Sequence, residues 1–319
     1  MTQQRRSQRQ RKRVGKRAYT VKRGSGLFNS FKKNNSKKNS ANGNAADTSR
    51  EPIRILAKSS SGITLNGAHL QYSIANIGGT AETLHFSLKP GQSVEAESGA
   101  LMHIYPGLSV RTRMGSGAVG RVFSGENIFT NVYTNEGTGP MELGLIPKLP
   151  GSMETFFLPK GRSMIISNTS FIACTPNVKR TTPIGFNRIF SMGLFLTKVS
   201  APESDGIVWL APFAGVHRIT IPAGESRIVD NGILLAIDSK IKTEITTLGQ
   251  TKTFLFGGEG IVIRLTNPTT QPQEVYIESR KLRDFIKLIA NSMPSPARTS
   301  VAAKATGSAI GAVFDFATS

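Results

Sequence analysis

The chain has 319 residues and carries 40 Lys and Arg against 20 Asp and Glu, a formal net charge of +20 at pH 7. It contains no run of about 18 apolar residues and no apolar signal-peptide core, which argues against a membrane-spanning helix and against secretion by that route. A single cysteine, Cys174, excludes an intrachain disulfide and a cysteine-built zinc site, so we expect an intracellular protein.

The N-terminal segment, residues 1–50, holds most of the excess charge. It contains 15 basic residues and one acid, which leaves +14, whereas the other 269 residues contain 25 basic and 19 acidic residues, which leaves +6. The segment mixes these charges with Gln, Asn, Ser and Gly and has too little apolar surface to offset the entropy of ordering. We therefore predict a disordered basic arm before a nearly balanced body at residues 51–279.

The charge pattern of the arm favours binding to a polyanion. Arg and Lys neutralise phosphates and release counterions, so such an arm binds nucleic acid with little sequence preference. The candidate binding residues are Arg5, Arg6, Arg9, Arg11, Lys12, Arg13, Lys16, Arg17, Lys22, Arg23, Lys32, Lys33, Lys37 and Lys38. Residues 9–13 could instead act as a nuclear address, and the arm as an organelle transit peptide, although no clear apolar stripe precedes Leu27. The remaining alternative is a tail that only aids solubility.

The segment "RMGSGAVGRVF", residues 113–123, has the G-x-G-x-x-G spacing of a dinucleotide-binding loop in Gly115, Gly117 and Gly120. Such a loop follows a strand and opens a helix. The preceding "LSVRTRM" alternates as a half-buried strand does, but the following "VFSGENIFTNVYT" is rich in β-branched and aromatic residues and also indicates a strand. We therefore predict a hairpin turn and no nucleotide binding there.

Three segments of the body follow one pattern: an aliphatic residue, a Pro/Gly turn, a strand, a polar break and a second apolar strand. They are "LKPGQSVEAESGALMHI" from Leu88, "LPKGRSMIISNTSFIAC" from Leu158 and "IPAGESRIVDNGILLAI" from Ile221, with turn glycines Gly91, Gly161 and Gly224. Downstream of each comes a strand led by a phenylalanine, and these residues are 67 and 66 positions apart: Phe123, Phe190 and Phe256. Two markers with nearly one period predict three units of about 65 residues.

The units span about residues 68–150, 151–217 and 218–279, and their short strands joined by turns predict an all-β body. Packed about a pseudo-threefold axis, three such units could cover one another's strand edges. The repeats also explain the glycine-rich turn, because its counterparts "TPIGFNR" and "TLGQTK" keep one glycine and lose the G-x-G-x-x-G spacing.

Several marker segments, "ESGALMHIYPGLSVRTRMG", "FSGENIF", "LGLIPKLPG", "VDNGILLAI" and "LFGGEGIVIRL", resemble the altered-inheritance-of-mitochondria protein 24 family over about residues 68–280. The resemblance implies a fold of the tryptophan RNA-binding attenuator protein-like group, with three double-stranded β-helix-like units. It also implies a link to mitochondrial organisation for eukaryotic members, and it brings no established catalytic residues. The attenuator's tryptophan- and RNA-binding ring does not carry over to a chain built in this way.

The chain departs from the family pattern in two places. The second unit reads "FSMGLF" and lacks a counterpart of Glu126 and Glu259, and the basic arm is not part of the family core. These two carboxylates could bind a cation or do acid–base work if they met. Acids at turns more commonly accept hydrogen bonds from backbone N–H groups, which is the role we expect for both.

The body shows no clear catalytic or metal-binding motif. The four histidines form no H-x-H or H-E-x-x-H pair: His69, His85, His103 and His217. His103 aligns with Ala173 and Ala236 of the other units, so we expect a partly buried structural residue. Cys174 aligns with aliphatic strand positions, which predicts an inert core thiol rather than a nucleophile.

The segment "RKLRDFIKLIANSMP", residues 280–294, is the best helix candidate. Leu282, Phe285, Ile286 and Ile289 follow the i, i+3, i+4, i+7 spacing of an amphipathic helix, which Pro294 ends. We expect the helix at 280–293 to pack on the β body, while its basic face would also suit a protein partner or a membrane surface. Residues 294–319 are small and apolar, and we expect a flexible tail.

These observations favour a non-enzymatic structural or interaction scaffold with a basic arm for nucleic acid or another polyanion, without a cofactor or metal. One alternative is a mitochondrial organisation factor that loses residues 1 to about 40 as a presequence. Others are a virion component that holds its genome through the arm, and a small-ligand binder or enzyme that uses grooves between units. The sequence does not distinguish the compartment, which could be the mitochondrial matrix or a virion. A homo-oligomer is compatible with the sequence.

Overall fold

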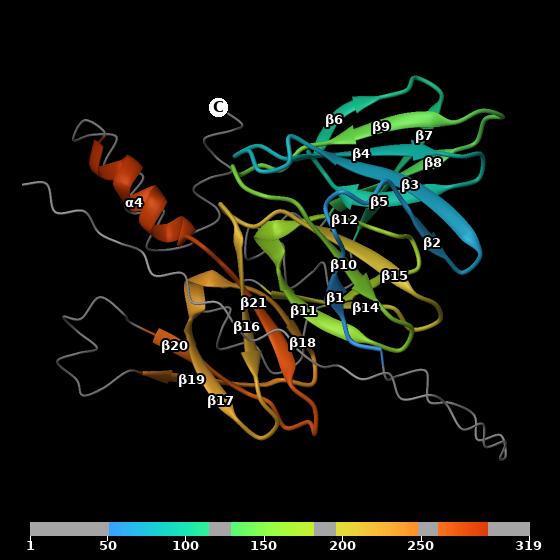
Figure 1. Cartoon of the computed structure of the whole chain (residues 1–319). Helices are drawn as coiled ribbons and strands as arrows, with labels where there is room; N and C mark the ends of the chain where they lie inside the picture. Colours follow the sequence, from blue (N-terminus) through green and yellow to red (C-terminus); the bar gives the residue numbers. More distant parts are fainter. Residues whose placement is uncertain (1–50, 115–128, 182–195, 248–260, 293–319) are drawn as a thin grey trace, which may run out of the picture. The chain divides into compact units, whose positions relative to one another are not determined.

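The structure, a computed structural model, describes residues 51–114, 129–181, 196–247 and 261–292 (Figure 1). These residues contain 21 strands, two short 3-10 helices and one α-helix, all within the compact unit Asp47–Ser319. The prediction of a β body followed by one C-terminal helix is therefore confirmed. The predicted arm, the C-terminal tail and the three connections that carry the phenylalanine markers lie outside the described residues.

The first three strands are β1 (Arg54–Ile55), β2 (Ile63–Leu65) and β3 (Ala68–Ala75). Six strands follow as β4 (Thr83–Leu88), β5 (Ser93–Glu97), β6 (Leu101–Ile104), β7 (Leu108–Met114), β8 (Phe129–Asn135) and β9 (Met141–Leu145). Six more are β10 (Glu154–Leu158), β11 (Ser163–Ser167), β12 (Phe171–Cys174), β13 (Lys179–Thr181), β14 (Leu196–Ser200) and β15 (Gly206–Leu210). The last six are β16 (Val216–Ile221), β17 (Ser226–Asp230), β18 (Leu234–Asp238), β19 (Lys242–Thr247), β20 (Ile261–Thr266) and β21 (Gln273–Glu278). The helices are η2 (Asn168–Ser170), η3 (Asn231–Ile233) and α4 (Leu282–Ser292).

Three successive groups of six strands use one pairing scheme, and we name them unit 1 (β4 to β9), unit 2 (β10 to β15) and unit 3 (β16 to β21). In each, the sixth strand lies between the first and the third, and the fifth lies between the second and the fourth. Every one of these pairs is antiparallel. The third strand also carries a register shift at one equivalent place, just before His103, Ala173 and Ala236, so the alignment of these three residues is confirmed.

Consecutive units are joined by strand pairing. The third strand of one unit pairs with the second strand of the unit before it, as β12 with β5 and β18 with β11. These junctions produce a seven-stranded sheet, β1-β10-β15-β12-β5-β8-β7, and a six-stranded sheet, β13-β14-β11-β18-β21-β16. A five-stranded sheet, β2-β3-β4-β9-β6, and a three-stranded sheet, β17-β20-β19, remain at the two ends of this series.

The turn between the first and second strands is built alike in each unit. Its glycine has a positive φ, of 78°, 74° and 74° at Gly91, Gly161 and Gly224, which residues with a side chain rarely adopt. Each glycine N–H donates to a carbonyl oxygen at or just after the end of the fifth strand, namely that of Asn135, Ala201 or Asn267. The predicted Pro/Gly turns are therefore present, and the chemistry of glycine explains why this position recurs in the sequence.

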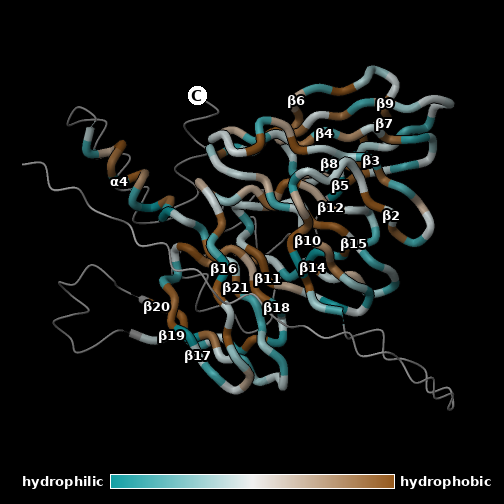
Figure 2. The backbone as a smooth tube through the Cα atoms, viewed as in Figure 1, coloured by the Kyte–Doolittle hydropathy of each residue, from teal (hydrophilic) through white to brown (hydrophobic). Residues whose placement is uncertain are grey.

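An aromatic contact fills each junction. The Trp209 ring meets Phe86 edge-on with centroids 5.0 Å apart, and Tyr276 meets Phe156 in the same way at 4.9 Å. Trp209 and Tyr276 occupy the same position in the sixth strands of units 2 and 3. The cores under the sheets therefore extend across unit boundaries, and Figure 2 shows hydrophobic stretches along strands such as β15.

The three units also meet along a short parallel ladder at the segments that precede their first strands. Gly151 forms bridges with Ala81 on one side and Ala214 on the other. Hydrogen bonds run to both neighbours of this segment, since Gly151 N–H donates to Thr80 O and Ala214 N–H donates to Pro150 O. A Cβ atom on Gly151 would collide with backbone, first with the carbonyl oxygen of Pro212.

We expect Gly151→Ala to lower the free energy of unfolding by about 1–3 kcal/mol, because the blocking atoms are backbone and cannot rotate away. Chemical denaturation of the full chain measures this. Gly139→Ala is the matched control, since a Cβ there meets nothing within 4 Å. Equal stability of the two variants would show that the ladder around Gly151 is looser than described.

Candidate nucleic-acid interface

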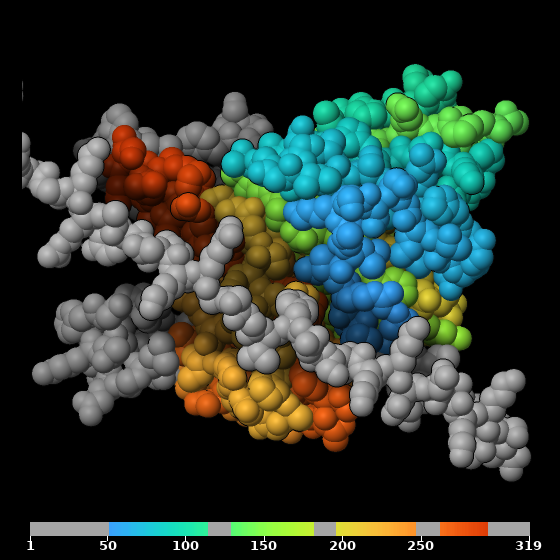
Figure 3. All heavy atoms as spheres, viewed as in Figure 1, coloured from blue at the N-terminus to red at the C-terminus, as the bar shows by residue number. Residues whose placement is uncertain are grey.

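The predicted binding arm ends at residue 50, and the residues that the structure describes begin at residue 51. The 14 basic candidate residues all lie within residues 1–40 and so outside the described residues. The structure does describe the segment that follows the arm. In Figure 3 these first described residues, coloured dark blue, lie on the surface against the rest of the body.

Residues 54–56 attach the start of the body to unit 2. Arg54 and Ile55 pair as β1 with β10, and Leu56 N–H donates to the carbonyl oxygen of Thr155 over 2.8 Å. The Arg54 guanidinium also lies over the Phe157 ring, 4.5 Å from its centroid. Backbone pairing and a cation–π contact together fix this strand on the edge of the seven-stranded sheet.

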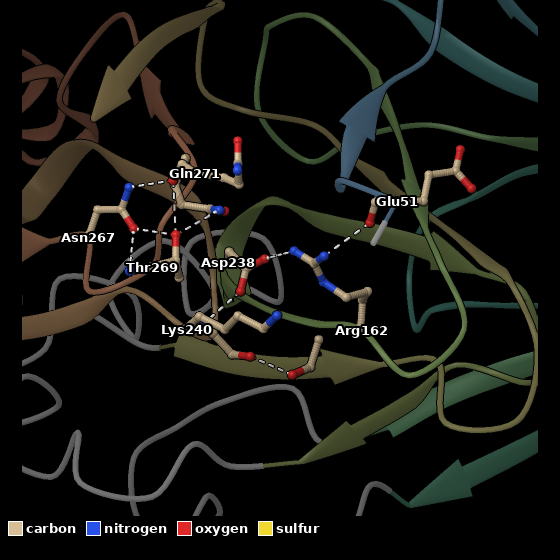
Figure 4. Close-up of polar contacts among 10 residues, drawn as sticks. Glu51, Arg162, Asp238, Lys240, Asn267, Thr269 and Gln271 are labelled. Atoms are coloured by element: carbon tan, nitrogen blue, oxygen red, sulfur yellow. Dashed lines mark hydrogen bonds and ion pairs between the residues drawn. The ribbon is translucent and has the colours of Figure 1, made fainter. Parts of the chain in front are cut away.

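A buried ion pair holds the segment just before β1. Arg162, just before β11, binds the Asp238 carboxylate at the end of β18, and their side chains are 8% and 5% exposed. The same guanidinium donates to the carbonyl oxygen of Glu51 over 3.0 Å (Figure 4). Removing one partner of such a pair would leave an uncompensated buried charge. Glu51, the first described residue, is therefore held beside the junction of units 2 and 3.

Lys58 forms a second anchor. Its Nζ atom lies 2.7 Å from a Glu82 oxygen and 3.0 Å from a Glu154 oxygen. Burial alone would raise the pKa of Glu82, but the hydrogen bond from Lys58 and those from the N–H groups of Met153 and Gly78 outweigh it, and the pKa is lowered. The carboxylates of Glu82 and Glu154 are thus already paired with Lys58.

A third charged cluster lies where unit 1 meets unit 2. The buried Glu95 of β5 accepts a hydrogen bond from Thr130 over 2.8 Å and lies 3.7 Å from both Arg113 and Arg180. The Arg180 guanidinium also lies over the Phe171 ring, 4.3 Å from its centroid. The two arginines balance the charge of Glu95, and the Phe171 ring covers Arg180. These contacts indicate that the cluster stabilises the fold.

Cys174 is an inert core residue, as the sequence predicts. Its side chain is 0% exposed, and burial, with Glu95 nearby, raises the pKa of the thiol to about 12. A nucleophilic cysteine needs an accessible thiolate. The thiol therefore stays protonated and covered at neutral pH.

Two of the four histidines are brought together, which their spacing in sequence does not reveal. His103 Nε2 lies 3.4 Å from His85 Nδ1, because both residues pair with Gly144 from opposite sides of β9. Burial and the neighbouring His103 ring lower the pKa of His85. The expectation of a partly buried His103 is wrong, since its side chain is exposed on the edge strand β6. Its counterparts Ala173 and Ala236 are covered by the preceding unit.

No metal centre emerges from these groups. Within residues 51–114, 129–181, 196–247 and 261–292, no three His, Cys, Asp or Glu side chains gather as a metal site would require. His69 contacts Thr64, and His217 is exposed on β16. The glycine-rich turn at 115–120, Glu126 and Glu259 lie outside the described residues.

The C-terminal helix α4 packs on the body as predicted. The Phe285 ring lies 5.1 Å from that of Phe213, and Lys281 Nζ lies 2.9 Å from an Asp230 oxygen. Ile286 and Ala290 are buried, and the helix alternates hydrophobic and hydrophilic residues (Figure 2). No helix of the described segments is long and apolar enough to cross a membrane.

One buried carboxyl group links units 2 and 3 and titrates near neutrality. Glu278 at the end of β21 accepts a hydrogen bond from Ser170 of η2 over 2.7 Å. Burial raises its pKa to about 7, against opposing hydrogen bonds from Ser170 and the Phe213 N–H. A folded-state pKa above the unfolded value stabilises the protonated form, so this contribution is lost as pH rises from about 4.5 through about 7.

We expect Glu278→Gln to gain stability relative to the original chain above pH 7, by on the order of 3 kcal/mol, because the amide cannot ionise. Urea denaturation at pH 5 and pH 8 measures the difference. Glu203→Gln is the matched control, because that side chain is 81% exposed and its replacement should change stability little at either pH. A difference between Glu278→Gln and the original chain that does not grow with pH would contradict the raised pKa.

Comparison with known proteins places the fold. Residues 75–280 match the family model described as Mitochondrial biogenesis AIM24, which spans more than half of the chain, and the chain belongs to this family. The crystal structure of protein SPYM3_0169 from Streptococcus pyogenes is similar with a TM-score of 0.56 and 20% identity, covering 70% of this chain and 100% of that one. At this identity the likeness shows the fold alone. A search of curated proteins finds no match.

Proposed function

We propose that this member of the AIM24 family is a non-enzymatic scaffold whose basic arm, residues 1–50, binds nucleic acid or another polyanion. The observation that carries the proposal is the abrupt charge boundary at residue 50, where a segment of +14 precedes 269 residues with a net charge of +6. Non-specific binding of this kind needs many cations and no shaped pocket. A phosphate backbone supplies the matching charge.

The contacts at the boundary support this role. The acids nearest the start of the body already have partners, because Asp238 binds Arg162 while Glu82 and Glu154 bind Lys58. They are therefore poor internal counter-charges for the arm. The segment that carries the arm is also attached by backbone pairing to β10, so a ligand held by the arm would be tethered to the body.

For the body we propose three copies of one unit about a common, pseudo-threefold axis, as the sequence predicts, in an open arrangement in which β6 of unit 1 and β17 of unit 3 do not pair within one chain. The repeated pairing scheme, the equivalent turns and the ladder through Gly151 support it. The buried thiol of Cys174 supports a non-enzymatic role. Helix α4, whose Leu288 is 64% exposed, is a candidate contact for a protein partner or a membrane surface.

The family description favours a second candidate, a mitochondrial organisation factor with a presequence that ends near residue 40. Cleavage there would leave the β1 anchor in the mature chain. Sequencing the N-terminus of protein isolated from its own cells separates the two proposals. A mature chain that begins near residue 40 favours the presequence, and a chain that retains residues 1–40 favours the binding arm.

We expect the affinity of the full chain for single- and double-stranded nucleic acid to fall steeply with salt. The log–log slope should be roughly −0.9 per phosphate neutralised on duplex DNA, so six contacts lose about a thousandfold between about 50 and 200 mM salt. Fluorescence anisotropy measures this for the full chain and for a truncated protein that begins at Arg50. The truncated protein keeps Glu51 and β1, so its body should be unchanged.

A charge-neutralised variant is the matched control for the arm. Changing Arg5, Arg6, Arg9, Arg11, Lys12 and Arg13 to Gln should flatten the salt slope and leave the melting temperature nearly unchanged. If the full chain and the truncated protein bind equally well with equal slopes, the arm is not the binding element.

A further inference from the structure

The junctions between units follow a rule that two strands do not satisfy. The third strand of a unit pairs with the second strand of the preceding unit, as β12 with β5 and β18 with β11. Unit 1 has no preceding unit, and unit 3 has no following one. Among the described residues, β6 is consequently an edge strand of the five-stranded sheet, and β17 is an edge strand of the three-stranded sheet.

The side chains of β6 are mostly apolar like those of β12 and β18, but no described strand of another unit covers them. Leu101 and Met102 are 41% and 52% exposed. Their counterparts in units 2 and 3 are also large and apolar and are at most 2% exposed: Phe171, Ile172, Leu234 and Leu235. Tyr105 just after the strand is 52% exposed, whereas the equivalent Thr175 is 5% exposed. An exposed edge strand with this composition is a template for pairing with another strand.

The second open edge, β17, also exposes an apolar side chain at a position that is covered in the other units. Ile228 is 41% exposed, whereas its counterparts Glu95 and Ile165 are 9% and 5% exposed because β12 and β18 lie against them. Arg227 beside it is exposed too. The three-stranded sheet that β17 borders is also the smallest, about half the size of its equivalents, because no third strand extends it.

We propose that β6 of one chain pairs antiparallel with β17 of a second copy of this chain. The two internal junctions give the register. Ala173 lies opposite Ala96 and Cys174 opposite Glu95 at the first junction, and the second junction has the same offsets. The equivalent register places His103 opposite Val229 and Ile104 opposite Ile228. The contact buries the apolar side chains of β6 and Ile228 and extends the three-stranded sheet by β6 and its neighbours.

A second copy is the occupant because the chain already contains this interface twice. The complementary surfaces are both present on every molecule, and β6 and β17 do not pair with one another within the described structure. The contact is head-to-tail, so it continues from copy to copy and ends as a ring or an open filament, depending on the rotation at each step. It is independent of the basic arm and would stand if the arm bound nothing.

Cysteine cross-linking tests the register. Full-length chains with Ile104→Cys and with Ile228→Cys, one of them tagged, are mixed and oxidised mildly with diamide after nuclease treatment and in high salt. Cysteine is already the residue at the equivalent place in β12, and the buried Cys174 should not react. We expect a disulfide-linked heterodimer in the mixture and none from Ile104→Cys alone.

Ile77→Cys is the matched control, because Ile77 is 53% exposed and lies in the connection between β3 and β4, away from both edges. It should not cross-link to Ile228→Cys above background. The double variant Ile104→Cys/Ile228→Cys distinguishes pairing between two chains from pairing within one chain. An intrachain disulfide in a monomer would mean that the chain closes on itself, as a closed threefold arrangement would, and would overturn pairing with a second copy.

Sedimentation velocity supplies a readout that needs no cysteine. The original chain should associate with rising concentration, and Leu101→Lys or Ile228→Lys should weaken that association by about tenfold or more, because a lysine on an edge strand opposes pairing. Ile77→Lys should not. Thermal melts check that each variant folds. A chain that is monomeric at every concentration and forms no cross-link would overturn the proposal.

Discussion

The fold depends on strand pairing across the boundaries between units. A small sheet of short strands needs a hydrophobic face covered by a neighbour to be stable. Pairing β12 with β5 and β18 with β11 turns such half-sheets into sheets of seven and six strands. The same junctions bring Trp209 onto Phe86 and Tyr276 onto Phe156, so that backbone pairing and aromatic packing stabilise one joint together. Stability is therefore shared between neighbours, as in other repeat proteins.

The contacts that hold the first described residues rest on this arrangement. Arg162 belongs to unit 2 and Asp238 to unit 3, and their ion pair forms because β11 and β18 are adjacent. The same guanidinium donates to the backbone carbonyl oxygen of Glu51, the first described residue. Loss of the junction would thus release the anchor and leave a buried charge without its partner.

Much of the local structure could be predicted from the sequence. The Pro/Gly turns were visible because a positive φ selects glycine at Gly91, Gly161 and Gly224, and the spacing of Phe285, Ile286 and Ile289 indicated helix α4. The alignment of His103 with Ala173 and Ala236 could also be predicted, because each unit repeats its strand pattern.

The meeting of distant residues could not be predicted from the sequence. The His85–His103 contact depends on both residues facing Gly144, and the Arg162–Asp238 pair depends on which strands of different units are neighbours. Neither contact could be read from the spacing of these residues along the sequence. The exposure of His103 leaves no signal in the sequence either, because a repeat pattern does not show that the first unit lacks a preceding unit to cover it.

Amide hydrogen exchange on the full chain at a concentration where it is monomeric tests the junctions most directly. Protection reports how often each strand opens. The account predicts that β12 and β18, which are paired on both sides, exchange slowly and as one group with β5 and β11, while the edge strands β6 and β17 exchange faster. Exchange in β12 and β18 as fast as in β6 and β17 would contradict the claim that pairing between units holds the body together.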